Sequence, residues 1–348
     1  MTAFKVLGSI FLSIFISASI WSTALADQVL INGAGATFPY PIYSKWFAEF
    51  HNVDPSVDIN YQSIGSGGGI RQLLDKTIDF GASDAPMTDE QMAKANPPIL
   101  HIPTVMGAVV ITYNLPTLKQ PLKLTGELIA ALFMGKIENW NDPAIVKLNP
   151  ELADAPDLKD TPVIVTHRSD GSGTTLVFSD YLSKVSPEWK QKVGVGNALK
   201  WPVGLGGKGN EGVTGLIKQA PGAIGYTELS YSSNNHLPVA LVQNKEGIFV
   251  APSAKAVTAA ANSFIKSMPK DFRISMTNGS GKDSYPLSSL TYILVYKTMD
   301  APKGKKFVSF LNWAVGDGQK LAESLMYAPL PKALASEVKQ KIKEVQTP

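Results

Sequence analysis

Cysteine is absent from this chain, and only four of its 348 residues are histidine. The lack of cysteine excludes a disulfide framework and a lipid-accepting cysteine behind an export signal. The histidines are scattered, and no histidine–carboxylate spacing indicates a metal site. We therefore expect neither a bound metal ion nor a cofactor.

The chain also has little net charge and, beyond its N-terminal segment, no apolar run long enough to span a bilayer. Its 32 basic and 29 acidic residues give a formal charge of +3 at pH 7. A nearly neutral chain without a basic stripe is a poor match for nucleic acid, so we predict no nucleic-acid partner.

The first 26 residues have the parts of an export signal. Lys5 supplies the positive charge, residues 6–22 form the apolar core, and Ala24-Leu25-Ala26 fits the small-x-small cleavage rule. An N-terminal membrane anchor is the alternative, but the apolar run is short and interrupted by serines. We predict cleavage after Ala26 and a periplasmic location.

After the signal, short apolar strands alternate with amphipathic helices. Residues 29–32, 57–62 and 78–82 have the pattern of strands, and helical periodicity follows the first two. Such alternation predicts an α/β fold whose sheet is covered by helices on both faces.

Two longer β-like runs, residues 105–113 and 290–296, divide the chain into two such units. They predict lobe I from residues 27–113 plus 289–348 and lobe II from residues 114–288. We expect two mixed sheets flanked by helices, each lobe with its own core, joined by a two-strand hinge around a cleft.

Three glycine-rich turns follow predicted strands, at residues 33–38, 65–69 and 168–174. The first turn of a helix offers unpaired N–H groups and a partial positive charge, which suit a tetrahedral oxyanion. Glycine lets such an N–H approach an oxygen closely. Each turn taken alone is more typical of ordinary capping and turn chemistry than of a binding site, and none matches a nucleotide signature.

Charged residues make the prediction more specific. Strand ends in α/β sheets face the ligand crevice, so Asp84, which follows the third strand, is expected near the turns. Arg168 can form two parallel bonds to an oxyanion, and Asp170 can orient it. An ionised carboxylate only accepts hydrogen bonds, so Asp84 suits an anion that carries a proton. Phosphate carries one at neutral pH, and sulfate does not.

The chain resembles the periplasmic phosphate-binding proteins of the bacterial phosphate ABC uptake system. The resemblance covers essentially the whole mature chain. It rests on residues 33–39, 65–69, 79–86, 168–174, 201–210 and 221–226.

The resemblance implies a two-lobed periplasmic binding protein of the type II-like kind. It implies a monomeric receptor that binds inorganic phosphate in the inter-lobe cleft and delivers it to a membrane permease powered by an ATPase, without chemistry on the ligand. It assigns no role to His167. The implied phosphate-binding residues are Thr37, Phe38, Ser66, Asp84, Arg168, Ser172, Gly173 and Thr174, and Asp170 would orient Arg168.

Three alternatives stay open at this point. One is a receptor for another oxyanion such as sulfate or molybdate, which Asp84 disfavours. Another is a hydrolase with Ser172 as nucleophile, although the Gly-x-Ser-x-Gly elbow is absent and no histidine forms a clear triad. A purely structural or adhesive protein would leave Asp84 and Arg168 unexplained.

Overall fold

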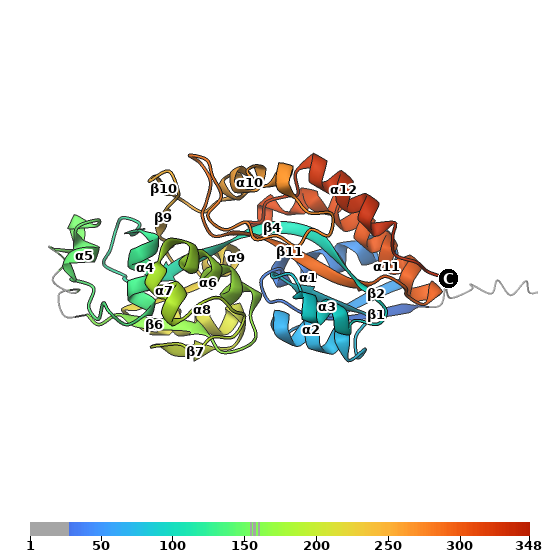
Figure 1. Ribbon diagram of the computed structural model, residues 1–348, viewed down its shortest axis with the longest axis horizontal. Coiled ribbons are helices and arrows are strands. Elements are labelled where there is room, and N and C mark those ends of the chain that lie inside the picture. The colour runs from blue at the N-terminus through green and yellow to red at the C-terminus, as the bar shows by residue number, and fades with distance from the viewer. Residues whose placement is uncertain (1–27, 154, 156–157, 159–160) are drawn as a thin grey trace, which may run out of the picture.

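The computed structural model describes residues 28–153, 155, 158 and 161–348 (Figure 1). The predicted export signal lies outside the described residues. Among the residues described, no helix is both long enough and apolar enough to cross a bilayer.

Strands and helices follow one another much as the periodicity predicts. The strands are β1 (Val29–Gly35), β2 (Val57–Ser63), β3 (Phe80–Ser83), β4 (Ile99–Tyr113), β5 (Lys123–Leu124), β6 (Ile164–Arg168), β7 (Leu205–Gly207), β8 (Ala223–Glu228), β9 (Leu241–Gln243), β10 (Phe249–Val250) and β11 (Ser288–Tyr296). The helices are α1 (Tyr40–Val53), α2 (Ser66–Leu74), α3 (Asp89–Lys94), α4 (Gly126–Phe133), α5 (Pro143–Val146), α6 (Gly173–Val185), α7 (Pro187–Lys192), α8 (Gly209–Gln219), α9 (Leu229–Asn234), α10 (Ala254–Asn262), α11 (Ala301–Ala314) and α12 (Lys332–Ile342). Short 3-10 helices are η1 (Pro150–Leu152), η3 (Ile265–Ser267), η4 (Asp317–Leu321) and η5 (Glu323–Leu325).

Eight strands form one sheet in the order β2-β1-β3-β11-β4-β8-β6-β7, and β10-β9-β5 form a second. The α/β fold class is confirmed, but the main sheet runs continuously through both predicted lobes. The reason is the length of β4, whose 15 residues pair with β11 up to Ala108 and with β8 from Val109 onward.

Helices cover both faces of the sheet in the first half of the molecule, which holds β1, β2 and β3 (Figure 1). Side chains alternate between faces along a strand. Phe80 of β3 therefore stacks on Phe307 of α11, while the position of Gly81 faces Leu73 of α2.

The second half repeats this arrangement around β6, β7 and β8. Tyr226 of β8 stacks on Phe178 of α6 with a centroid separation of 4.2 Å. Its neighbour Gly225 faces Ile217 of α8 on the other side of the sheet. The two halves are thus built alike and share one sheet.

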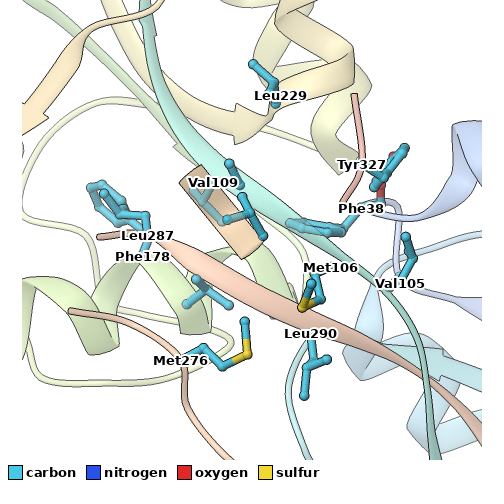
Figure 2. Packing of buried hydrophobic residues seen from close by; sticks show 14 of the residues in the cluster. Phe38, Val105, Met106, Val109, Phe178, Leu229, Met276, Leu287, Leu290 and Tyr327 are labelled. Carbon is cyan, nitrogen blue, oxygen red and sulfur yellow. The ribbon is translucent and has the colours of Figure 1, made fainter. Parts of the chain in front are cut away.

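The buried core also runs through the crossing instead of forming two separate cores. A single cluster spans both halves, and only a small second cluster forms around Val213, Ile217 and Ala223. Figure 2 shows the crossing, where Met106 and Val109 of β4 lie among side chains from both halves, including Phe38 and Phe178. Both crossing strands are almost wholly buried, so apolar contacts pass through the predicted hinge.

Strand ends and helix starts converge between the halves. β1 leads to Thr37, β3 leads to Asp84, and β6 ends at Arg168. Helices α2, α6 and α8 begin at the same place. The second glycine-rich turn differs slightly from expectation, because its glycines at residues 67–69 lie inside the first turns of α2.

Gly35 is required where β1 leaves the sheet. Its φ of +147° disfavours other residues, and an added Cβ would lie 2.1 Å from the Ala82 carbonyl oxygen. We expect Gly35→Ala to lower the free energy of unfolding by roughly 3 kcal/mol. Gly215→Ala in α8 is the control, because its Cβ meets open space and a helical alanine adds about 0.5–1 kcal/mol. Denaturant unfolding without ligand measures both, and equal effects would contradict the assignment.

Candidate functional site

The structure brings the predicted site residues together from both halves of the molecule. The Ser66 hydroxyl oxygen accepts hydrogen bonds from the N–H groups of Asp84, at 3.3 Å, and Gly173, at 3.1 Å. Gly67 N–H also bonds the Gly171 carbonyl across the same gap, at 2.8 Å. The predicted side chains Thr37, Phe38, Ser66, Asp84, Arg168, Ser172 and Thr174 are all at most 3% exposed.

Arg168, which is buried, and Asp170, whose side chain is 11% exposed, form a two-bonded ion pair. Arg168 Nε donates to Asp170 Oδ1 at 2.8 Å, and Nη2 donates to Oδ2 at 2.6 Å. Burial alone would raise the pKa of Asp170, but the bonds from Arg168 and from the Gly209 N–H outweigh it and lower that pKa. The pair therefore stays ionised with little net charge, and Nη1 points away from the pair toward Thr174, at 3.3 Å.

Asp84 is the one carboxyl group among the eight predicted binding residues. Its Oδ1 accepts from the Thr291 hydroxyl at 3.0 Å, and its Oδ2 lies 3.5 Å from the Thr174 hydroxyl. Burial raises the pKa of Asp84 to about 7, against the lowering effects of the Thr291 bond and the Arg168 charge. This carboxyl can therefore gain or release a proton near neutrality.

The helix starts supply further donors. Ser172 caps α6 by accepting the Thr175 N–H at 3.0 Å, while its own N–H bonds the Asn197 carbonyl at 2.7 Å. Because the Ser172 hydroxyl oxygen is the acceptor in the bond to Thr175, its hydrogen can still be donated to a ligand. The N-terminal ends of α2 and α8 add their partial positive charges at the same place.

Glycine is needed at residue 173 for the halves to approach. An added Cβ there would lie 2.5 Å from Ser66 Oγ and 2.8 Å from Asp84 Cβ. Any larger residue would push the first half of the site away from the start of α6.

The segment at Thr37 and Phe38 is held by two tyrosines. Tyr231 Oη donates to the Thr37 carbonyl, and Tyr327 Oη contacts the Phe38 carbonyl, both at 2.6 Å. Because C=O and N–H point in opposite directions in a trans peptide, the bond from Tyr231 also fixes the direction of the Phe38 N–H.

Two residues that the sequence analysis did not single out complete the site. Thr291 lies in an apolar β-like run with no signal to distinguish it. Asn210 donates from Nδ2 to Thr37 at 2.8 Å and to Thr174 at 3.3 Å. Its signal was available, because residues 205–210 repeat the layout of strand, glycines and helix start seen in the other turns.

The arrangement suits binding and offers no recognisable catalytic machinery. His167 is buried and stacks on Trp201 at 4.5 Å, and its Nδ1 contacts the Arg168 carbonyl and not Ser172. Burial lowers the pKa of His167. In the described part of the chain, no group of three or more metal-ligating side chains comes together.

A cavity of about 660 Å³ reaches Asp84 from the side of α6. Its other lining residues include Val177 and Asp180 of α6 and Arg273 and Thr277 of the segment facing that helix. Asp84 is the one predicted binding residue that lines this cavity.

Comparisons of the sequence with known proteins give one consistent family. Residues 21–314 match the family model described as PBP superfamily domain. The chain is 46% identical to phosphate-binding protein PstS of Xylella fastidiosa over 319 residues, covering 91% of this chain and 86% of the relative. It is 46% identical to the PstS of Pasteurella multocida, covering 93% and 92%, and 38% identical to that of Methanocaldococcus jannaschii, covering 89% and 84%.

Solved structures show the same fold. A high-affinity periplasmic phosphate-binding protein with bound phosphate superposes with a TM-score of 0.72 at 18% identity, covering 92% of this chain and all of that one. A phosphate-binding protein from Stenotrophomonas maltophilia gives a TM-score of 0.66 at 18% identity, covering 90% and 94%.

The raised pKa of Asp84 predicts how stability depends on pH. Between about pH 4 and pH 7 Asp84 holds a proton in the folded state that it has released in the unfolded chain. The contribution of Asp84 to the free energy of unfolding therefore falls as pH rises through this range. Asp84→Asn abolishes that dependence. We expect the variant to gain stability relative to the unsubstituted protein between pH 5 and pH 8, by an amount on the order of a few kcal/mol. Denaturant unfolding in oxyanion-free buffers measures this, and parallel pH profiles would contradict it.

Proposed function

The chain belongs to the PBP superfamily and, within it, to the PstS phosphate-binding proteins, and we propose that the donor cage around Asp84 holds its phosphate. The protein is an extracytoplasmic receptor that binds inorganic phosphate for ABC-type uptake. Its family consists of binding receptors, so its function is capture and delivery without chemistry on the ligand. The observation that carries the proposed site is a single buried carboxyl acceptor surrounded by hydrogen-bond donors.

We assign the phosphate contacts to eight residues, with Asp170 orienting Arg168. Donors converge from two helix starts and from the Thr37 segment, and the compensated charge of Arg168 leaves directed hydrogen bonds as the main attraction. Burial makes each of these bonds count for more than at a surface. The eight are Thr37, Phe38, Ser66, Asp84, Arg168, Ser172, Gly173 and Thr174.

Asp84 provides the choice of ligand. Phosphate at neutral pH carries one proton, and one proton is what a carboxylate and an anion oxygen need in order to bond. Sulfate brings none, so Asp84 must first take up a proton or face the sulfate oxygen without a hydrogen between them. Leaving such a buried pair unbonded costs several kcal/mol, so sulfate should bind only when Asp84 is protonated. Because the pKa of Asp84 is about 7, the protonated form becomes about tenfold rarer with each pH unit above 7, and selectivity for phosphate should rise accordingly.

Delivery of phosphate to the transporter requires movement of the lobes and docking in addition to binding. We propose that the lobes formed by residues 27–113 plus 289–348 and by residues 114–288 close around phosphate through bending of β4 and β11. The closed monomer would then dock on the permease and ATPase subunits of the transporter. We also propose that the mature periplasmic protein begins after Ala26.

Substitution of Asp84 tests the selectivity. Asp84→Asn replaces an acceptor oxygen with an N–H donor, so we expect weaker phosphate binding and stronger sulfate binding. The ratio of the two affinities should fall by about 10–1000-fold, since one charged hydrogen bond is at stake on each ligand. Calorimetric titration with both anions at pH 8 measures the ratio. Asp75→Asn, an exposed loss of the same charge, is the control, and an unchanged ratio at residue 84 would refute the account.

The ion pair gives a second test. Arg168→Ala removes donors and leaves Asp170 as a largely buried, uncompensated negative charge. We expect phosphate affinity to fall at least about 100-fold in Arg168→Ala and to recover partly in the double variant Arg168→Ala/Asp170→Ala. Competition binding with radiolabelled phosphate compares the two. A double variant that binds no better than the single one would show that charge compensation by Asp170 is unimportant.

A further inference from the structure

We propose that Asn210 is a specificity-determining positioning residue, whose side-chain amide forces the hydroxyls of Thr37 and Thr174 to act as donors toward the anion. The inference rests on the proposed phosphate site. It adds a reason why the hydroxyls of Thr37 and Thr174 donate hydrogen bonds in that site and do not accept them. Asn210 is fully buried at the start of α8 and bonds residues from both halves of the molecule.

The orientation of the Asn210 amide is fixed by the backbone. The Glu228 N–H at the end of β8 points at Asn210 Oδ1 at 3.1 Å. A backbone N–H can only donate, so the atom facing it must be the amide oxygen. The NH₂ group is therefore the part that faces the hydroxyls, and its two hydrogens have two hydroxyl oxygens within reach.

The Thr37 hydroxyl can act toward a ligand only as a hydrogen-bond donor. Its Oγ1 accepts the backbone N–H of Asn210 at 3.1 Å and the side-chain Nδ2 at 2.8 Å. A hydroxyl oxygen has two lone pairs, and both are occupied. The O–H bond of Thr37 must then point away from Asn210, as a donor.

Thr174 is fixed in the same way from two directions. Its Oγ1 lies 3.3 Å from Arg168 Nη1 and 3.3 Å from Asn210 Nδ2, and both of these nitrogens can only donate. The Thr174 hydrogen is therefore directed to an acceptor, either Asp84 Oδ2 at 3.5 Å or an anion oxygen in the cage.

This polarity has a consequence for recognition. A free hydroxyl can turn to donate or to accept, so it discriminates poorly between protonated and bare oxygens. With Asn210 in place, neither the Thr37 nor the Thr174 hydroxyl can accept a hydrogen bond from a protonated ligand oxygen. The single protonated oxygen is then directed to Asp84.

Two substitutions at Asn210 separate this role from simple packing. Asn210→Asp keeps the size but replaces the NH₂ with an acceptor, which turns both hydroxyl hydrogens away from the ligand. Asn210→Ala leaves a hole but imposes no direction. We expect phosphate affinity to fall at least about 100-fold in the aspartate variant and about tenfold in the alanine variant. Asn234→Asp adds the same charge at an exposed position of α9 and should leave affinity unchanged.

Calorimetry with inorganic phosphate ranks the variants, and thermal unfolding without phosphate shows that each one folds. A packing role predicts the reverse order, with alanine the weaker binder, and that order would overturn the proposal. The buried charge of Asn210→Asp would also repel the anion, so a cycle of Asn210→Ala with Thr37→Val is needed to separate hydroxyl orientation from charge. Coupled effects are expected in the cycle, and additive effects would overturn the proposal. Absence of phosphate binding by the unsubstituted protein would instead refute the proposed function.

Discussion

The pairing of β4 with β11 is the interaction on which the rest of the molecule depends. These two strands are the only described elements that connect the halves within the sheet, and their side chains carry one core through the crossing. β11 also pairs with β3, setting Tyr292 opposite Ser83, the residue before Asp84. A register shift in the β4 pairing falls between Thr291 and Tyr292, next to the hydroxyl that bonds Asp84. The proposed hinge and the proposed acceptor Asp84 therefore depend on the same strand pairing.

The charged side chains of the site are buried at low cost because their charges are paired or can be neutralised. Arg168 is compensated by Asp170, and Asp84 holds or releases its proton near pH 7, so no strong uncompensated charge is sealed in. Glu228 extends the pattern, because burial raises its pKa to about 8 and favours the neutral form. An anion entering such a place is attracted by N–H and O–H groups more than by net charge.

Most of the fold could be predicted from the sequence, because period-2 and period-3.6 patterns and glycine-rich turns are local signals. Asp84, Arg168 and Asp170 were accessible for the same reason, since each lies beside a strand end. Thr291 and the continuity of the sheet were not accessible, because both depend on pairing between strands far apart in sequence. Asn210 carried a local signal, but its meaning needed Thr37, which lies in the other half.

The position of β11 bears on the order in which the chain can fold. This strand lies between β3 and β4, yet residues 288–296 are made long after both. A chain that emerges N-terminus first therefore lacks the centre of its sheet until most of it has been synthesised. Non-local pairing of this kind is slow. A nascent chain that folds late stays unfolded for longer, and an unfolded chain is the form that can pass through a narrow membrane translocon before the native sheet forms.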